Sequence, residues 1–508
     1  MSLLWIIALV ILLYARTLRY KYVIDDYVKR EGYLYDIPME GTGHGFWSRS
    51  PSPWYRAFMI GMHCVNVSII YLIWGWTPAL LFAVHPMSVW GTAWVTGNYY
   101  ATTAYFCLIS YYILTVFPNA WGALAAVAIY TAALNSTICA IGFPLLFAGF
   151  PWGLALFFPL IMFFNGRRFR TGIKIRTVFN RTAKVDTRFT PKRLILMVKL
   201  VGKYLYTMII PDRLGMFTNY GRLLQDHQDR YDEMHRVNKD FWVSLLLCSS
   251  IVALGILVSP VGTLWLFIFL GVHSQFKLMG QFYAQRYIYL PLIGLSVIVG
   301  TILSDYTLFT VAVATFLVIR THLFIPAWQN QEALLRHDME MYPDNPHTWN
   351  NGLNYLLGKK DGVFVNEYDM HEAAQWMIRA RTLSPNNYEI NMNVAAYYNA
   401  TGQIKLTLYY TDKAIECLRP IGGEDHPMMV KLYDQKSRIE ERINKLTKEG
   451  RLGSFHKEGS LSPPGDAVCL NSKGGRGNGK IKRGKKGAKY YGSPKHQRRA
   501  KRPTNSFE

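Results

Sequence analysis

The sequence predicts an all-α protein in which a bundle of transmembrane helices is followed by a short helical-repeat domain and a disordered basic tail. Three observations lead to this prediction. Half of the 508 residues are hydrophobic and 18% are charged, so the chain is too apolar for an ordinary soluble enzyme. The apolar residues gather in windows long enough to cross about 30 Å of hydrocarbon as helices. The net charge of +23 is concentrated in one loop between two such windows and in the C-terminal tail.

We expect about eleven transmembrane spans, which together form a transmembrane domain over residues 1–325. The first span, 3–23, has neither the basic start nor the small-residue cleavage site of a signal peptide, so we expect it to stay in the membrane. The other spans are expected at 57–74, 76–95, 99–117, 119–136, 140–164, 194–211, 241–258, 261–279, 284–303 and 305–325.

The charges of the loops predict how these spans are oriented. Segment 165–193 holds many lysines and arginines and a single acid, which is typical of a cytoplasmic loop. Counting spans from this loop places the first loop, 24–56, and the C-terminal domain on the outer or lumenal face. Arg16, Arg19 and Lys21 favour the opposite orientation, but they carry much less charge than the loop. We therefore expect a bacterial inner-membrane protein or a protein of the endoplasmic reticulum.

Residues 326–446 have the pattern of a tetratricopeptide-like repeat domain. Small and aromatic side chains recur at the positions that such repeats, with a period of about 34 residues, use for packing. These positions are Ala373, Trp376, Ala380, Ala395, Tyr398, Gly402 and Ala414. Two repeats are expected, with 426–446 as a third repeat or a capping helix. Because so few repeats are marginally stable alone, we expect them to rest on the membrane domain.

Residues 447–508 are rich in Gly, Lys, Arg, Ser and Pro. Such a segment cannot bury enough apolar surface to fold, so we expect a disordered tail. Its positive charge suits anionic membrane lipid, polysaccharide or nucleic acid, and a solvated tail without a specific partner is an equal alternative.

Asp25 and Asp26 are the strongest candidates for chemistry. They follow the first span directly and lie on the outer face in the expected topology. Two neighbouring carboxylates make each other harder to ionise, and such pairs serve as general bases or as cation ligands. If a divalent cation is a cofactor, these are the residues that we would assign to it, since no other His, Cys or acidic residues have metal-ligand spacing. A pair of solvated loop acids is the alternative.

Six further motifs follow the acidic pair in order: FWSRSPSPWYRAF, MHCVNVSIIY, LFAVHPMSVWGTAWVTGNYYATTAYF, KYLYTMIIPDRLGMFTNY, FYAQRYIYLPLIG and IRTHLFIPAWQNQ. From about Ile24 to Cys417 this order resembles the transmembrane and tetratricopeptide-repeat O-mannosyltransferases. They are members of the GT-C superfamily, whose sugar donors are linked to polyprenyl phosphates. The LFAVHP and QRYIYLP runs are the most specific parts of the resemblance.

The resemblance implies a membrane glycosyltransferase that moves a sugar, such as mannose, from a polyprenyl-phosphate donor to a serine or threonine hydroxyl of a protein held by the repeats. Asp25 or Asp26 would be the catalytic base, and Arg286 and Arg320 would bind the donor phosphate. The other site-lining residues would be Arg56, His63, Asn66, His85, Asn98, Gln285 and Tyr289. Because an arginine beside an apolar span needs an anionic partner, we expect Arg286 within about 12 Å of Asp25 or Asp26.

The chain departs from the pattern of this family at several polar positions. Where the pattern has glutamate, this chain has Trp90 and Gln285, and where it has Gly-Arg and Lys-Glu, this chain has Gly97-Asn98 and Thr137-Ile138. Two alternatives therefore stay open. One is an oligosaccharyltransferase or ligase of the same superfamily. The other is a non-catalytic membrane scaffold whose repeats and basic tail recruit partners.

Overall fold

The structure is a computed structural model that describes residues 2–21, 23, 53–136, 138–149, 151–165, 190–216, 236–275, 283–358, 367–424 and 426–450. By its contacts the chain divides into two units, Met1–His456 and Lys457–Glu508, and all described residues lie in the first. The acidic pair at 25–26, residues 166–189 of the expected cytoplasmic loop, and the tail after 450 lie outside the described residues.

All regular structure in the described ranges is helical, and these ranges contain no strand. Four helical stretches are long and apolar enough to cross a membrane: Trp54–Trp74, Lys239–Val258, Gln285–Leu303 and Thr307–Gln329. They coincide with four of the expected spans. The prediction of an all-helical fold with helices able to cross a membrane is thereby confirmed for the described residues, whereas several other expected spans are shorter or interrupted.

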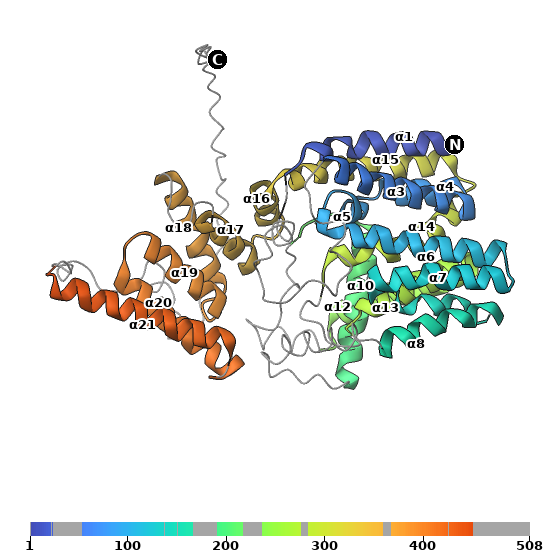
Figure 1. Cartoon of the computed structure of the whole chain (residues 1–508). Coiled ribbons are helices and arrows are strands. Elements are labelled where there is room, and N and C mark those ends of the chain that lie inside the picture. The colour runs from blue at the N-terminus through green and yellow to red at the C-terminus, as the bar shows by residue number, and fades with distance from the viewer. Residues whose placement is uncertain are drawn as a thin grey trace, which may run out of the picture. The chain divides into compact units, whose positions relative to one another are not determined.

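We call the expected transmembrane domain, residues 1–325, the membrane segment. Four helices from its two ends pack side by side (Figure 1). They are α1 (Leu3–Tyr14), α3 (Pro53–Trp74), α4 (Trp76–Val84) and α15 (Thr307–Phe324). A 3-10 turn, Ala15–Arg19, continues α1, and Arg16 in this turn donates a hydrogen bond to the carbonyl of His322 in α15. The first and last helices of the membrane segment are thus joined directly.

The expected span 76–95 is not one helix. It ends at Val84, because Pro86 restricts His85 to an extended conformation and cannot donate a backbone hydrogen bond. The chain then forms short helical turns before the next long helix begins at Asn98. These turns are Pro86–Ser88, α5 (Val89–Thr92) and Val95–Gly97. We call residues 85–97 the His-Pro turn.

The expected span 140–164 is also interrupted, because Pro144 and Pro151 fall within it. It consists of 3-10 helices at Ile138–Phe147 and Pro151–Leu156 and of α8 (Phe157–Asn165). The remaining helices of the membrane segment are α6 (Asn98–Val116), α7 (Ala120–Ser136), α10 (Pro191–Ile209), α12 (Lys239–Val258), α13 (Pro260–His273) and α14 (Tyr289–Leu303). A 3-10 turn, Gln285–Ile288, precedes α14, and another, Ile325–Gln329, follows α15.

The described residues of the C-terminal part form six helices, each packed on the next. They are α16 (Gln331–Met341), α17 (Pro346–Gly358), α18 (Glu367–Leu383), α19 (Tyr388–Ala400), α20 (Ile404–Gly422) and α21 (Pro427–Lys448). The alanines that the repeat pattern singled out are fully buried. The large aromatic side chains of Trp376 and Tyr398 are nearly so. A helix is present where the third repeat or capping helix was expected.

The contact between α13 and α14 depends on glycine. A Cβ atom at Gly294 would lie 2.5 Å from the carbonyl oxygen of Gly262 and 2.5 Å from the backbone nitrogen of Leu266. Backbone atoms cannot move aside as a flexible side chain can, so the helices would have to separate. Small residues at helix contacts are the means by which membrane helices approach each other closely.

We therefore expect Gly294→Ala to destabilise the protein by about 1–3 kcal/mol through overpacking, measured as the free energy of unfolding in detergent. Gly61→Ala is the matched control, because no atom lies within 4 Å of a Cβ built at Gly61 in α3. The control should be neutral or slightly stabilising, since alanine favours helix over glycine. Equal stability of the two variants would contradict this account of the helix contact.

Candidate functional site

Arg56 fixes the chain just before the acidic pair. This buried side chain of α3 donates one hydrogen bond to the carbonyl of Lys21 and one to that of Ala93, both at 2.6 Å. The backbone nitrogen of Lys21 in turn donates to the carbonyl of Gln329 at 2.9 Å. The segment that leads to 25–26 is therefore held on the His-Pro turn. Because the pair itself lies outside the described residues, its distance from Arg286 stays a prediction.

Arg286 lies against the same turn. Its guanidinium carbon is 5.9 Å from the ring centre of Trp94 and 5.1 Å from that of Tyr287. The ring of Tyr287 is itself stacked on His273, with centroids 4.0 Å apart. Cations are attracted to the faces of aromatic rings, so these contacts hold Arg286 in place. Trp94 directly follows Ala93, the residue that Arg56 binds.

Trp90 occupies the place where the resemblance expects a glutamate. It packs perpendicular to Trp328 and to Trp94, with ring centroids 4.8 and 5.8 Å away, and all three side chains are buried. Their indole nitrogens have no hydrogen-bond partner among the residues that the structure describes. An unpaired carboxylate in such surroundings would be strongly disfavoured. The tryptophan thus belongs to an apolar cluster.

His63 takes part in a set of hydrogen bonds that closes the end of α4. The last carbonyls of a helix have no donors within the helix, and Pro86 prevents this one from continuing. Side chains from three elements donate instead: Ser88 to Phe82 at 2.7 Å, His63 Nε2 to Ala83 at 3.2 Å and Thr321 to Val84 at 2.6 Å. His63 therefore carries its proton on Nε2.

Two more of the expected site residues meet His63 inside the bundle. The hydroxyl of Tyr289 donates to His63 Nδ1 at 2.8 Å and accepts from the side-chain amide of Asn66 at 3.3 Å. That amide also donates to the carbonyl of Ala101 at 2.9 Å. All three side chains are buried, and their hydrogen bonds join α3, α4, α6 and α14. Asn98 is not part of this network; its side-chain amide donates to the hydroxyl of Tyr55 in α3.

His85 and Arg320 both bind the backbone at the C-terminal end of α10. His85 Nε2 donates to the carbonyl of Met208, in the last turn of the helix, at 2.8 Å. Arg320, in α15, donates to the carbonyl of Pro211 through Nε at 3.0 Å and Nη2 at 2.7 Å, and to that of Asp212 at 2.6 Å. The structure therefore places both residues in contacts with backbone where α10 ends. We call residues 208–216 the clamped segment.

Gln285 holds the same segment through its side-chain amide. Its Oε1 accepts from the backbone nitrogen of Gly215 at 3.0 Å, and its Nε2 donates to the carbonyl of Arg213 at 2.7 Å and to the hydroxyl of Tyr342 at 3.2 Å. The side chain is buried. Since it both accepts and donates, an amide satisfies this position and a carboxylate cannot. This explains a glutamine where the resemblance expects glutamate.

The first C-terminal helix, α16, covers the clamped segment with three residues that the sequence did not single out. The buried carboxylate of Asp338 accepts from the backbone nitrogen of Met216 at 3.1 and 3.0 Å. His337 Nε2 donates to the carbonyl of Leu214 at 2.8 Å, and the hydroxyl of Tyr342 donates to that of Arg213 at 2.9 Å. Burial raises the pKa of Tyr342, so its hydroxyl stays protonated.

The described residues contain no group of three or more His, Cys, Asp or Glu side chains that could hold a metal ion. Asp25 and Asp26, the residues to which a cation was assigned from the sequence, lie outside them. Comparison of the chain with protein-family profiles, with curated proteins and with solved structures gives no match.

The contacts of Gln285 predict the effect of restoring an acid. We expect Gln285→Glu to destabilise the fold by about 1–3 kcal/mol, because a carboxylate would face the carbonyl of Arg213 without a proton to donate. The free energy of unfolding in detergent measures this change. Gln403→Glu, at an exposed turn, is the matched control and should be neutral. A stabilised Gln285→Glu variant would show that the amide contacts are not needed.

His337 predicts a pH dependence of the contact between α16 and the clamped segment. Burial lowers the pKa of His337 from its usual 6.5, and Arg320 lowers it further, whereas the carbonyl of Leu214 and Glu340 oppose this shift. The folded state therefore keeps His337 neutral. Its contribution to stability is present above about pH 6.5 and is lost as the pH falls from there toward the lowered pKa.

We expect acidification from about pH 7.5 to about pH 5.5 to speed hydrogen exchange at the amide of Met216, after correction for the intrinsic rate. His337→Gln should abolish this acid sensitivity. His371→Gln, at an exposed site on α18, should keep it. The same acid response in all three proteins would exclude His337 as its source.

Proposed function

We propose that this protein is a GT-C-type membrane glycosyltransferase with about eleven spans, a tetratricopeptide-like repeat domain and a basic tail. It would transfer a sugar, such as mannose, from a polyprenyl-phosphate donor to a serine or threonine hydroxyl of a protein on the outer or lumenal face. One observation carries the proposal. Arg56 holds Lys21, four residues before Asp25, against Ala93, and Arg286 lies over the neighbouring Trp94.

Two functional groups of opposite charge would act at this turn. Asp25 or Asp26 would remove the proton from the acceptor hydroxyl as its oxygen attacks the anomeric carbon with inversion. The bond from that carbon to the phosphate oxygen breaks at the same time, and the lipid phosphate leaves with the electron pair. Arg286 would stabilise the charge of the departing phosphate. A guanidinium suits this role because its planar fork matches phosphate oxygens.

A non-catalytic scaffold is the second candidate, and a specific observation favours it. Trp90 and Gln285 stand where the resembled family has acids, and both make contacts that a packed interior needs: an aromatic cluster in one case and three hydrogen bonds in the other. In this alternative the membrane segment serves as an anchor, and the C-terminal helices and basic tail recruit partners.

Transfer assays on membranes that contain the full chain separate the two candidates. With a labelled polyprenyl-phosphate sugar as donor, we expect the Asp25→Asn/Asp26→Asn double variant to lose at least about 100-fold in transfer rate, because a positioned general base contributes about 10²–10⁴-fold. Arg286→Lys should lose a similar factor, because lysine cannot fork onto phosphate. Asp305→Asn and Arg438→Lys, both at exposed sites, are the matched controls.

Undiminished transfer by the Asp variant would exclude the proposed base. Absence of transfer by the wild-type chain with every monosaccharide donor tested would favour the scaffold. Transfer only from a diphosphate-linked oligosaccharide would identify a ligase instead.

A further inference from the structure

Helix α16 has two working faces. Arg336 and Met339 lie on one side of the helix and contact the other C-terminal helices, whereas His337 and Asp338 contact the clamped segment, as does Tyr342, the residue that follows the helix. Residues three or four apart share a face of an α-helix, and residues separated by about half a turn lie on opposite faces. Helix α16 therefore contacts both the other C-terminal helices and the clamped segment.

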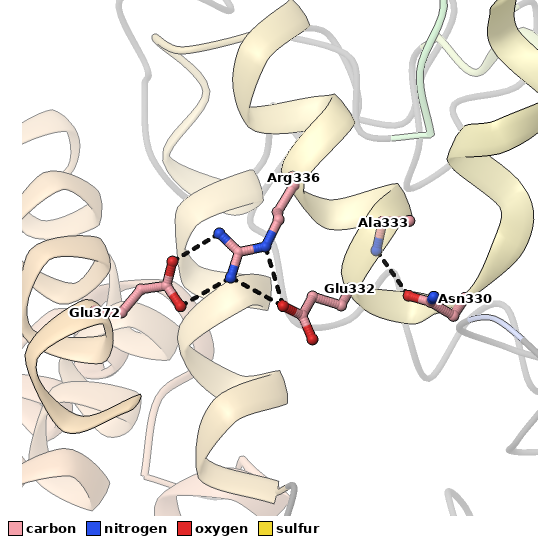
Figure 2. Close-up of polar contacts among 5 residues, drawn as sticks. All are labelled: Asn330, Glu332, Ala333, Arg336 and Glu372. Atoms are coloured by element: carbon pink, nitrogen blue, oxygen red, sulfur yellow. Dashed lines mark hydrogen bonds and ion pairs between the residues drawn. The ribbon is translucent and has the colours of Figure 1, made fainter. Parts of the chain in front are cut away.

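The face toward the C-terminal helices is held by an ion pair. Arg336 donates through Nη1 and Nη2 to the two carboxylate oxygens of Glu372 in α18, at 2.7 and 2.9 Å, and also binds Glu332 on its own helix (Figure 2). Its guanidinium lies 5.3 Å from the ring centre of Trp376. A fork of two parallel hydrogen bonds fixes direction as well as distance. A movement of α18 is therefore passed to α16.

Side chains are closely packed at the face toward the C-terminal helices. A Cβ atom at Gly352 in α17 would lie 2.3 Å from the methyl carbon of Met339 and 2.7 Å from the ring of Trp376. Side chains of α16 and α18 thus both contact the backbone of α17 at this glycine. Interiors packed to this density transmit displacement instead of absorbing it.

The opposite face is equally tight. A Cβ atom at Gly215 would lie 2.6 Å from the carboxylate of Asp338 and 2.8 Å from the ring of Tyr342, so the backbone of the clamped segment rests directly on α16. Gln285 binds both Gly215 and the hydroxyl of Tyr342. Arg286 is the next residue of the same short 3-10 turn, Gln285–Ile288. A displaced Gln285 must therefore shift Arg286 across the rings that hold it.

We infer that α16 couples the C-terminal helices to Arg286, and that Asp338, Tyr342 and Gln285 are positioning residues for that arginine. The functional consequence rests on the proposed glycosyltransferase: a protein acceptor engaged by the C-terminal helices would adjust the group that receives the departing lipid phosphate. Such a link would make phosphate binding depend on the state of the C-terminal helices. The coupling itself is independent of that activity and can be measured without it.

Backbone amides of the full chain in lipid nanodiscs report the coupling directly. The amides of Gly215, Met216 and Ala284 donate to the side chains of Gln285, Asp338 and Tyr204. We expect Glu372→Gln, which changes only a residue of α18, to speed hydrogen exchange at all three amides by about tenfold. Glu424→Gln is the matched control, because it weakens another exposed ion pair, with Arg419, and should leave these amides unchanged.

A second pair of variants keeps the test decisive if Glu372→Gln disrupts the helices. Tyr342→Phe removes one hydroxyl that binds Arg213 and Gln285, and should speed exchange at Gly215 and Ala284. Tyr433→Phe removes a hydroxyl that binds Glu424 and Arg419, and should not. Arg336→Lys keeps the charge of α16 without the fork and should act as Glu372→Gln does.

Exchange that rises only within α16–α18 in Glu372→Gln and Arg336→Lys, with Gly215 and Ala284 at the wild-type rate, would overturn the coupling. Binding of a polyprenyl phosphate without sugar provides the functional readout, and Glu372→Gln should weaken it several-fold. Failure of the wild-type chain to bind this lipid would instead count against the proposed function, and the exchange results would still decide the coupling.

Discussion

The need to satisfy buried backbone hydrogen bonds organises this molecule. Where the chain leaves the helical conformation inside an apolar bundle, its carbonyls and amides have neither water nor a helix to pair with. The clamped segment, residues 208–216, is such a stretch, which begins in the last turn of α10. His85, Arg320 and Gln285 reach it from the membrane helices, and α16 reaches it from the other side. These contacts join the membrane segment to the C-terminal helices.

The His-Pro turn meets the same requirement in another way. Pro86 stops α4, and the carbonyls that it leaves unpaired receive hydrogen bonds from His63, Ser88 and Thr321. Arg56 then joins the carbonyl of Ala93 to the start of the first loop. The interrupted helix thus creates a polar turn in the membrane segment. The candidate site is built on that interruption.

The sequence was sufficient to predict helices, four apolar stretches long enough to cross a membrane, and the buried small residues of the C-terminal part. These features follow from hydrophobicity and spacing, which a chain displays directly. The roles of individual polar residues could not be predicted in the same way. His85 and Arg320 bind backbone carbonyls, and a carbonyl is present at every residue, so it leaves no mark in the sequence. The prolines at the two interruptions, Pro86 and Pro151, were visible, but apolar composition alone favoured continuous spans there.

The arginines of the site differ in the groups that they contact. Arg56 and Arg320 use the edges of their guanidinium groups for backbone carbonyls, and so act as braces. Arg286 instead lies beside the rings of Trp94 and Tyr287, which attract its charge without neutralising it, and its Nη2 donates a hydrogen bond to the hydroxyl of Tyr287 at 3.5 Å. A phosphate binds at the edge of a guanidinium. A cation that lies beside aromatic rings is suited to receive an anion as well, which is why Arg286, among these three, carries the proposed role.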